Sequence, residues 1–331
     1  MTWGMQNTEA EAHEQLSYAA DQGVHTLDTA EIYPVPTKAE TQGRTDKYIG
    51  TWLKGRKRDS VVVLTKVAGY SANSTWVRNP PRTTRVTRDQ IRESVDASLM
   101  RLQTDYVDLL QIHWPDRYVP LFGGPSYDPS QQRPDDVPFE EQLRGLEEVI
   151  KAGKVRHIGV SNETSYGVAE FVHLAKTAGL PKICSIQNSY SLLNRGQYET
   201  DLAETCLHHK VGLLAYSPLA GGGLTGKYNV GQVDPKARFN LFAGYMERYT
   251  TSTVKAAVGD YMEVASKHGL TPTQLALAWC RSRWCVTSSI IGATSMEQLK
   301  ENLEAFDKDI SQECLDAINA VYKKFRDPTL R

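Results

Sequence analysis

Four side chains in the first part of the sequence have the types that a proton-transfer site needs. They are Asp28, Tyr33, Lys66 and His113. A free tyrosine has a pKa near ~10, which is too high for efficient acid or base catalysis at neutral pH. A neighbouring ammonium group stabilises the phenolate and lowers that pKa, so Lys66 beside Tyr33 would make the phenol a better proton donor.

Lys66 and His113 each need a defined protonation state in such a site. A buried lysine tends to lose its proton unless a carboxylate lies beside it, and Asp28 could supply that carboxylate. A neutral His113 could donate one ring N–H to a carbonyl oxygen and orient that oxygen toward Tyr33. Taken singly, these residues could equally be a turn-capping aspartate, a lysine reaching solvent and a packed ring. Together they favour a proton-donating site for a carbonyl compound.

The elements that must position these residues follow a repeated pattern of strand and helix. The expected strands are 24–28, 61–64 (continuing to Lys66), 107–112, 156–160, 183–186, 211–215 and 286–291. The main expected helices are 9–22, 44–55, 88–102, 138–152, 253–268, 272–282, 295–305 and 311–323, whereas 219–250 is Gly-rich and loop-like. Strands this apolar indicate a parallel sheet with helical crossovers. We expect one domain over 1–331.

The pattern alone allows either a doubly wound sheet or a (β/α)8 barrel. The polar residues decide between them, because each lies at the C-terminal end of a different strand. These strand-end residues are Asp28, Lys66, His113, Asn162, Gln187, Tyr216 and Gly292. In a barrel the C-terminal ends of all strands converge on one face, whereas in an open sheet they spread along a line. The sequence therefore predicts an α/β protein with a (β/α)8 TIM-barrel fold.

Composition excludes several classes of function. Hydrophobic residues make up 40% and charged residues 23% of the 331 residues, which is typical of a globular protein with a sizeable core. The net charge of -1 and the absence of a basic patch argue against nucleic-acid binding. No apolar stretch reaches the ~20 residues of a membrane span. The five scattered cysteines indicate reduced thiols, no metal site and a cytoplasmic protein.

Several motifs occur around the strand ends. They are Leu27-Asp28-Thr29-Ala30-Glu31-x-Tyr33, Lys66 after a Val-rich strand, Asp108-Leu109-Leu110-Gln111-Ile112-His113-Trp114, Gly153-Lys154-Val155-Arg156-x-Ile158-Gly159-Val160-Ser161-Asn162, Tyr216-Ser217-Pro218-Leu219 and Gly292-Ala293-Thr294. In type and order, over roughly 1–305, they resemble the motifs of the aldo-keto reductases. The loop 34–43 and the run 187–194 are most similar to the Tas-type and potassium-channel-β-like branch.

The resemblance implies a reductase that uses NADPH and a small-molecule carbonyl substrate. Tyr33 would be the general acid, tuned by Lys66 paired to Asp28, and His113 would orient the carbonyl group. The residues near the nicotinamide would be Ser161, Asn162 and Gln187 for its carboxamide and Tyr216 stacked on its ring; Ser217 and Leu219 would also bind the cofactor. The chain has no Gly-x-Gly-x-x-Gly after a strand, which agrees with a dinucleotide bound without a Rossmann motif.

The resemblance also implies an adenosine end at the last part of the barrel. The helix that begins near Ser295 would offer backbone N–H groups to the 2′-phosphate. The other residues implied here are Gly292 and Thr294 before the helix, and Gln298, Glu301 and Asn302 along the adenine. Many relatives carry Lys or Arg in the first turn of that helix, where this chain has Ser295-Met296. We expect Arg238 to supply that charge instead.

The start of the sequence departs from the family pattern. Relatives begin with a hairpin and a first barrel strand, of which only Met1-Thr2-Trp3-Gly4 has a counterpart here. We therefore expect seven full strands, two exposed strand edges and an N-terminally shortened form of the barrel. An organelle address in an upstream segment is the alternative to a cytoplasmic location.

The tetrad of Asp28, Tyr33, Lys66 and His113 leaves three functions open. The leading hypothesis is reduction of aldehydes or ketones. The alternatives are an NADPH-binding regulatory or chaperone-like subunit with little turnover, as in the channel-β relatives, and an inactive shortened form. Substrate identity is expected in the loops 67–87, 115–137 and 219–250. The sequence does not distinguish a monomer from a homo-oligomer.

Overall fold

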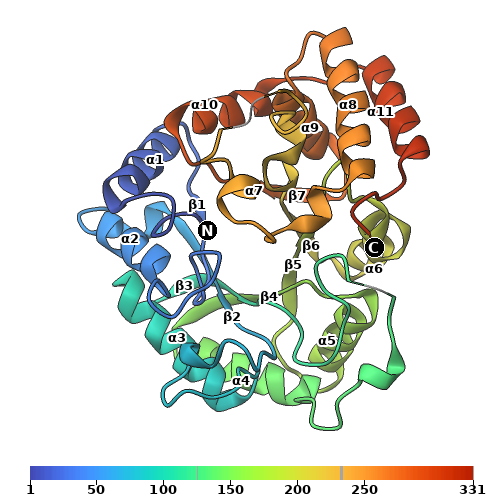
Figure 1. Ribbon diagram of the computed structural model, residues 1–331. Coiled ribbons are helices and arrows are strands. Elements are labelled where there is room, and N and C mark those ends of the chain that lie inside the picture. The colour runs from blue at the N-terminus through green and yellow to red at the C-terminus, as the bar shows by residue number, and fades with distance from the viewer. Residues whose placement is uncertain (125, 232–233, 331) are drawn as a thin grey trace.

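Seven parallel strands form a nearly closed barrel inside a ring of helices (Figure 1). The computed structural model describes residues 1–124, 126–231 and 234–330, so parts of the predicted loops 115–137 and 219–250 and residue 331 lie outside the described residues. The strands are Thr26–Asp28 (β1), Val62–Val67 (β2), Val107–Ile112 (β3), Val155–Ser161 (β4), Ile183–Ser189 (β5), Gly212–Tyr216 (β6) and Val286–Ile290 (β7).

The order of the strands distinguishes the barrel from a doubly wound sheet. Each strand pairs in parallel with the next one along the chain, from β1 to β7, with no reversal of order. A doubly wound sheet reverses its order at a switch point, which this sheet lacks. The barrel fold predicted from the strand-end residues is therefore confirmed.

Segments outside the sheet connect the first part of the barrel to the last part. Within the described residues β1 and β7 do not pair with each other. The Asn7 side-chain amide donates to the carbonyl oxygen of Thr294, in the loop after β7, over 3.0 Å. In addition, α1 (Glu9–Asp21) contacts α10 (Met296–Glu304). These contacts join the two ends of the helical ring across the unpaired strands.

The outer helices begin and end close to where the sequence predicts. The remaining α-helices are Arg44–Leu53 (α2), Arg88–Leu102 (α3), Phe139–Lys151 (α4), Ser165–Thr177 (α5), Ala203–His209 (α6), Arg238–Leu241 (α7), Ser252–Lys267 (α8), Pro272–Ser282 (α9) and Gln312–Lys324 (α11). Capping residues set several of these starts; Thr8, for example, forms a capping box with Glu11 at the start of α1. In the described residues, no helix combines the length and apolar character needed to cross a membrane.

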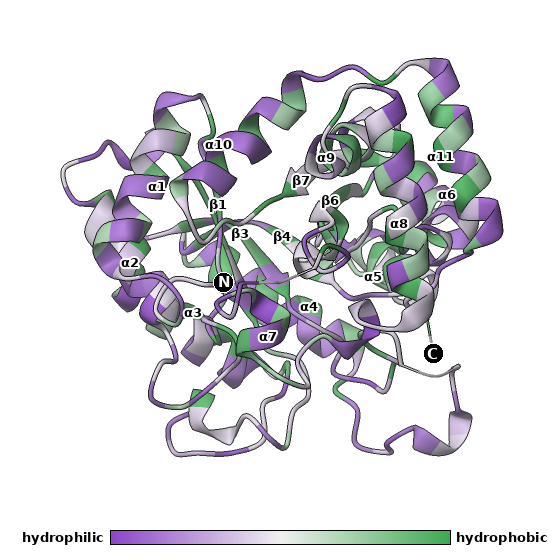
Figure 2. Ribbon diagram, turned by 45° about the horizontal axis from the view of Figure 1, so that its top comes forward, coloured by the Kyte–Doolittle hydropathy of each residue, from purple (hydrophilic) through white to green (hydrophobic). Residues whose placement is uncertain are grey.

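The barrel core is apolar because the strands are covered on both sides. All six residues of β3 are buried, and so are five of the six in β2. Figure 2 shows hydrophobic colouring on the strands and on the inner sides of the helices, with hydrophilic residues outward. The helices therefore cover the sheet as parallel β/α architecture requires.

Short helical turns shape the connecting segments. They are Arg58–Ser60 (η1), Thr75–Val77 (η2), Pro129–Gln131 (η3), Tyr198–Leu202 (η4), Ala220–Thr225 (η5), Glu247–Tyr249 (η6) and Ala305–Asp307 (η7). The segment 219–250, predicted as a loop, thus contains η5, α7 and η6. Glycines at 221 and 222 with positive φ interrupt η5, which explains why no helical period is visible there.

Candidate active site

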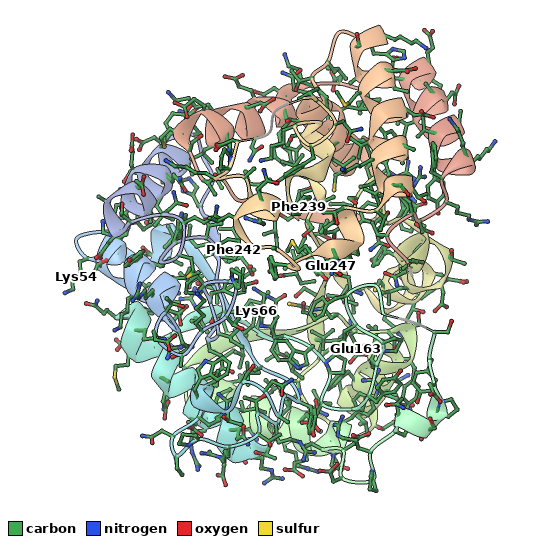
Figure 3. The ribbon with its side chains drawn as sticks, viewed as in Figure 1. Lys54, Lys66, Glu163, Phe239, Phe242 and Glu247 are labelled. Atoms are coloured by element: carbon green, nitrogen blue, oxygen red, sulfur yellow. The ribbon has the colours of Figure 1, made fainter. Side chains whose placement is uncertain are left out.

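An ion pair lies at the C-terminal ends of the first two strands. Lys66 on β2 donates to Asp28 Oδ2 over 2.7 Å and to the carbonyl oxygen of Thr29 over 2.8 Å. The Lys66 side chain is completely buried, and Figure 3 shows it inside the ring of helices. Burial lowers the pKa of Lys66 and the charge of Asp28 opposes that shift. The carboxylate is thus the partner that this buried amine needs.

Tyr33 and His113 lie beside this ion pair. The Tyr33 and His113 rings meet edge to face, with centroids 5.6 Å apart. Lys66 Nζ lies 5.0 Å from the centroid of the Tyr33 ring. The four side chains singled out in the sequence therefore form one cluster, although they come from three strand ends and one loop.

The protonation of Tyr33 differs from the sequence-based expectation. Burial raises the pKa of Tyr33, and the negative charge of Asp28 raises it further. The expected net lowering of the Tyr33 pKa was wrong, because burial and the charge of Asp28 outweigh the nearby ammonium group of Lys66. Tyr33 therefore keeps its proton at neutral pH. In this state it can act as a proton donor but not as a base.

His113 is held as a neutral ring. Burial, assisted by the charge of Lys66, lowers the pKa of His113 well below its usual 6.5. Its Nδ1 is buried and has no hydrogen-bond partner among the described residues. The backbone that follows His113 packs closely on Gly69, since a Cβ atom on Gly69 would lie 1.8 Å from the carbonyl oxygen of Trp114. A neutral imidazole with an unused ring nitrogen can donate to a carbonyl oxygen.

A chain of hydrogen bonds connects His113 to the opposite side of the barrel. Asn162, directly after β4, donates to the carbonyl oxygen of His113 over 2.8 Å and accepts from the Tyr216 hydroxyl over 2.6 Å. Asn162 has a φ of 53°, a conformation that asparagine tolerates better than most residues. The two hydrogen bonds of Asn162 thus connect Tyr216, the last residue of β6, to His113, directly after β3.

Gln187 and Ser161 lie between Asn162 and the ion pair of Lys66 and Asp28. Gln187 on β5 donates to Asp28 Oδ1 over 2.9 Å, a contact that no sequence pattern indicated. The Ser161 hydroxyl donates to the carbonyl oxygen of Gln187 over 2.6 Å. Both residues are buried. The predicted nicotinamide residues thus adjoin the tetrad, and Gln187 helps to fix Asp28.

The segment after β6 carries positive charge. Ser217, with a φ of 56°, and Leu219 lead into η5, and Arg238 is the first residue of α7. Burial lowers the pKa of Arg238, and burial together with Arg238 lowers that of Lys227. Within the described residues neither side chain forms an ion pair. Lys227 was not among the predicted cofactor residues, although it ends the Gly-rich run at 221–227.

The residues predicted for an adenosine end lie together around the start of α10. Ser295 caps this helix by accepting from the Gln298 backbone N–H. Gln298 Oε1 accepts from the backbone N–H and the hydroxyl of Thr294, over 3.0 and 3.1 Å. Asn302 donates to the carbonyl oxygen of Gly292 over 3.5 Å. Glu301 instead accepts from Thr271, before α9.

A second buried ion pair supports the Tyr33 loop. Arg78 donates to both carboxylate oxygens of Glu31, over 2.7 and 3.0 Å. Glu31 also accepts from the backbone N–H of Ala68, two residues after Lys66. Glu31 belongs to the 27–33 motif, but its partner is 47 residues away and cannot be inferred from spacing.

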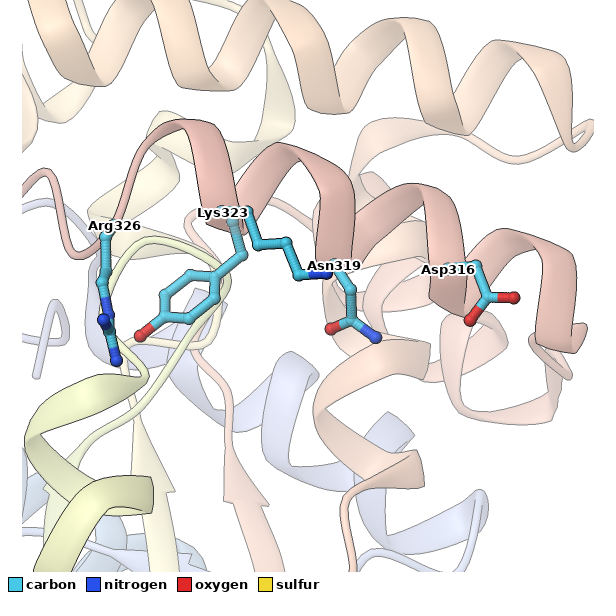
Figure 4. Close-up of a pocket in the computed structure, with 5 residues that line it drawn as sticks. Asp316, Asn319, Lys323 and Arg326 are labelled. Atoms are coloured by element: carbon cyan, nitrogen blue, oxygen red, sulfur yellow. The ribbon is translucent and has the colours of Figure 1, made fainter.

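Two hollows lie outside this cluster. One of about 650 Å³ is lined by residues of and just after α11, including Asp316, Asn319 and Lys323 (Figure 4). Another, of about 530 Å³, lies between the segment after β3 and the starts of α4 and α5. Neither is lined by a tetrad residue.

Comparison with known proteins adds independent information. The profile of the "Aldo/keto reductase family" matches residues 1–323. The chain is 45% identical to "Protein tas" of Escherichia coli (strain K12), over 99% of this chain and 94% of that protein. It is 40% identical to an "Aldo-keto reductase" of Babesia bovis, over 81% and 98%. It is 32% identical to a "Probable voltage-gated potassium channel subunit beta" of Arabidopsis thaliana, over 93% and 85%.

Proposed function

Since the chain belongs to the aldo/keto reductase family, as its motifs predicted, we propose that it is an NADPH-dependent reductase of aldehydes or ketones. Membership of the family supports an oxidoreductase in general. The observation that carries the finer proposal is the tetrad, in which a protonated Tyr33 and a neutral His113 adjoin the buried pair of Lys66 and Asp28.

The chain offers groups that suit NADPH. Lys227 and Arg238 are partly buried cations that form no ion pair within the described residues, so an anion such as a phosphate would offset their desolvation. Ser161, Asn162, Gln187 and Tyr216 would hold the nicotinamide end. The other residues proposed to bind the cofactor are Ser217, Leu219, Gly292, Thr294, Gln298, Glu301 and Asn302. Bound NADPH would supply the hydride ion that the carbonyl carbon accepts.

The chain itself would supply the proton and hold the substrate. A neutral His113 would donate a hydrogen bond to the carbonyl oxygen and hold it near Tyr33. The Tyr33 hydroxyl would then transfer its proton to that oxygen as negative charge develops there, giving the alcohol. Solvent would return a proton to the phenolate. Lys66, fixed by Asp28, would stabilise the transient negative charge on Tyr33.

The substitution Tyr33→Phe tests this role directly. We expect turnover of 4-nitrobenzaldehyde, followed by the loss of reduced-nicotinamide absorbance, to fall by about 100-fold or more because the acid is removed. NADPH binding, followed by fluorescence, should persist. Tyr18→Phe on α1, outside the cluster, is the matched control and should keep wild-type turnover. A wild type that is no faster than Tyr33→Phe contradicts the enzymatic proposal.

The similarity to a potassium channel β subunit favours a second candidate function. In that case the chain would be an NADPH-binding regulatory subunit with little turnover. The same tetrad would then serve binding, so geometry does not separate the two functions. Persistent NADPH binding with no turnover of reactive aldehydes by the wild type would favour the regulatory function.

A further inference from the structure

Arg248, at the middle of η6, holds a positive charge without a carboxylate partner among the described residues. One terminal nitrogen, Nη1, donates to the carbonyl oxygen of Phe122 over 3.0 Å. The other, Nη2, donates to the Tyr249 hydroxyl over 3.3 Å. In the part of the chain that the structure describes, Arg248 forms no ion pair. Its charge is therefore held in place mainly by neutral oxygens.

These contacts place Arg248 at the face of the barrel that carries the tetrad. The Tyr249 hydroxyl lies 3.5 Å from the Ser189 hydroxyl, at the C-terminal end of β5. Ser189 is the register partner of Tyr216 on β6. On the other side, Phe122 belongs to the segment that follows His113. The guanidinium thus lies between the segments that leave β3 and the ends of β5 and β6.

Electrostatic interactions connect Arg248 to the proposed catalytic residues. Its charge acts on Tyr216 and on Tyr245, and the pKa of each of these tyrosines also responds to Tyr33. Figure 1 shows the segment around α7, which leads to η6, across the middle of the ring of helices. Arg248 and Tyr33 thus act on the same two tyrosines, Tyr216 and Tyr245.

The stem of Arg248 is fixed before any ligand arrives. A Cβ atom on Gly123 would lie 3.1 Å from Arg248 Cδ and 2.9 Å from the carbonyl oxygen of Thr329. Gly123 has a φ of 81°, so a side chain there would be strained as well. The arginine stem therefore packs directly on backbone, which limits the motion of the guanidinium and lowers the entropy cost of binding.

The guanidinium keeps donors for a ligand. Arginine carries five N–H donors in a planar fork, and two of them are used by the contacts with Phe122 and Tyr249. A planar carboxylate fits such a fork with two parallel hydrogen bonds. A charge that is partly removed from water and unpaired also gains more from an anion than an exposed one does.

Three cations of this segment are partly buried and form no ion pair with any described residue, and they divide into two groups. Lys227 and Arg238 interact with each other and with Tyr228 or Asp234. Arg248 interacts instead with Tyr216 and Tyr249, and it shares only Tyr245 with Arg238. The first group therefore suits the phosphates of the cofactor, whereas Arg248 contacts the segment that follows His113, through Phe122.

We propose that Arg248 binds a carboxylate group on the substrate, so that the preferred substrates are aldehydes or ketones that also carry a carboxylate. This inference rests on the proposed reductase function and names its substrate class. The competing explanation is that Arg248 only ties the segment after β3 to η6, through Phe122 and Tyr249. The two explanations differ in how substitution affects charged and neutral substrates.

The test compares 4-carboxybenzaldehyde with the uncharged 4-nitrobenzaldehyde. We expect wild type to have the higher kcat/KM for the carboxylate. In Arg248→Met the ratio of the two kcat/KM values should fall about 10- to 100-fold, the loss expected for a charge-assisted hydrogen-bonded pair. Arg248→Lys keeps the charge without the planar fork and should retain part of the preference. Arg144→Met, an exposed arginine on α4, should keep the wild-type ratio.

The outcomes separate this inference from the proposed function. An unchanged ratio in Arg248→Met overturns the inference, even if both rates fall, because a purely structural tie would affect both substrates alike. A wild type that reduces 4-nitrobenzaldehyde without preferring the carboxylate overturns it as well. If wild type reduces neither aldehyde, the proposed function fails. In that case, calorimetric titration with 4-carboxybenzyl alcohol tests Arg248 separately. If Arg248→Met binds this alcohol as tightly as wild type does, the assignment of Arg248 is overturned.

Discussion

The chemistry of single residues in this site is set by burial more than by neighbouring charge. Lys66 lies 5.0 Å from the Tyr33 ring centroid, yet the pKa of Tyr33 is raised. The reason is that burial, assisted by the charge of Asp28, raises this pKa by more than the ammonium group of Lys66 could lower it. The same desolvation keeps His113 neutral. One apolar environment thus gives a protonated tyrosine and an uncharged imidazole, the two states that carbonyl reduction needs.

The lowered pKa of His113 predicts an acid-sensitive fold. The pKa of this histidine in the folded state lies below the 6.5 of the unfolded chain, so the unfolded state binds the additional proton. Stability is therefore lost as pH falls below that value. Between about pH 7.5 and about pH 5.5, we expect wild type to lose up to about 1.4 kcal/mol more unfolding free energy than His113→Gln.

Urea unfolding followed by circular dichroism at the two pH values measures this difference. His208→Gln, at an exposed position on α6, is the control and should lose the same free energy as wild type. An equal pH dependence of wild type and His113→Gln would show that His113 does not contribute to acid sensitivity.

At the scale of elements, the outer helices hold the strand ends in place. The hydroxyl of Thr29, whose carbonyl oxygen binds Lys66, donates to Asp46 on α2 over 2.6 Å. Asp46 in turn accepts from Arg101 on α3 over 2.9 and 3.0 Å. The packing of α2 on α3 is therefore connected to the ion pair in the barrel.

A glycine allows these two helices to approach each other. A Cβ atom on Gly50 of α2 would lie 2.3 Å from the carbonyl oxygen of Arg101. We expect Gly50→Ala to lower the unfolding free energy by about 1–3 kcal/mol, because backbone must move. On α8, a Cβ atom on Gly259 would meet nothing closer than 3.7 Å. There the substitution by alanine should raise stability by up to about 1 kcal/mol, from helix propensity alone.

Thermal and urea unfolding of the two alanine variants measure both effects. Opposite signs for the changes at Gly50 and Gly259 are expected. A Gly50→Ala variant as stable as Gly259→Ala would show that α2 and α3 are not in close contact.

The sequence predicted these elements well where the information is local. The predicted helix 88–102 coincides with α3, and the strand 107–112 coincides with β3. Apolar periodicity and N-cap residues such as Thr8 lie within a few positions of the element they define. The segment 219–250 was predicted as a loop, because its short turns η5 and η6 lack a full helical period.

Over the whole molecule, a contact is harder to predict from the sequence when its two residues lie farther apart along the chain. The clustering of Asp28, Lys66 and His113 followed from the barrel, which brings every strand end to one face. The pairing of Gln187 with Asp28, 159 residues apart, and the positions of Arg248 and Lys227 did not follow from it. Such contacts depend on side-chain directions and on loop conformations, which no local pattern encodes.

A cofactor that spans the barrel face should stabilise the whole molecule. The proposed cofactor residues come from the ends of β4, β5 and β6, from α7 and from α10, so a bound dinucleotide would connect both sides of the ring. A ligand that binds only the folded state at 100 times its Kd adds about 2.7 kcal/mol to the unfolding free energy. We expect NADPH to raise the Tm, and to raise it more than NADH does, because Arg238 is proposed to bind the 2′-phosphate.

Substitutions of the two cations should separate their roles. Arg238→Met should remove most of the difference in Tm between NADPH and NADH, since only NADPH carries the 2′-phosphate. Lys227→Met should instead reduce the Tm increase for both cofactors, if this lysine binds the diphosphate that both share. Lys255→Met, an exposed position on α8, is the control and should behave as wild type. An unchanged difference in Arg238→Met would move the 2′-phosphate site away from α7, toward the backbone N–H groups at the start of α10.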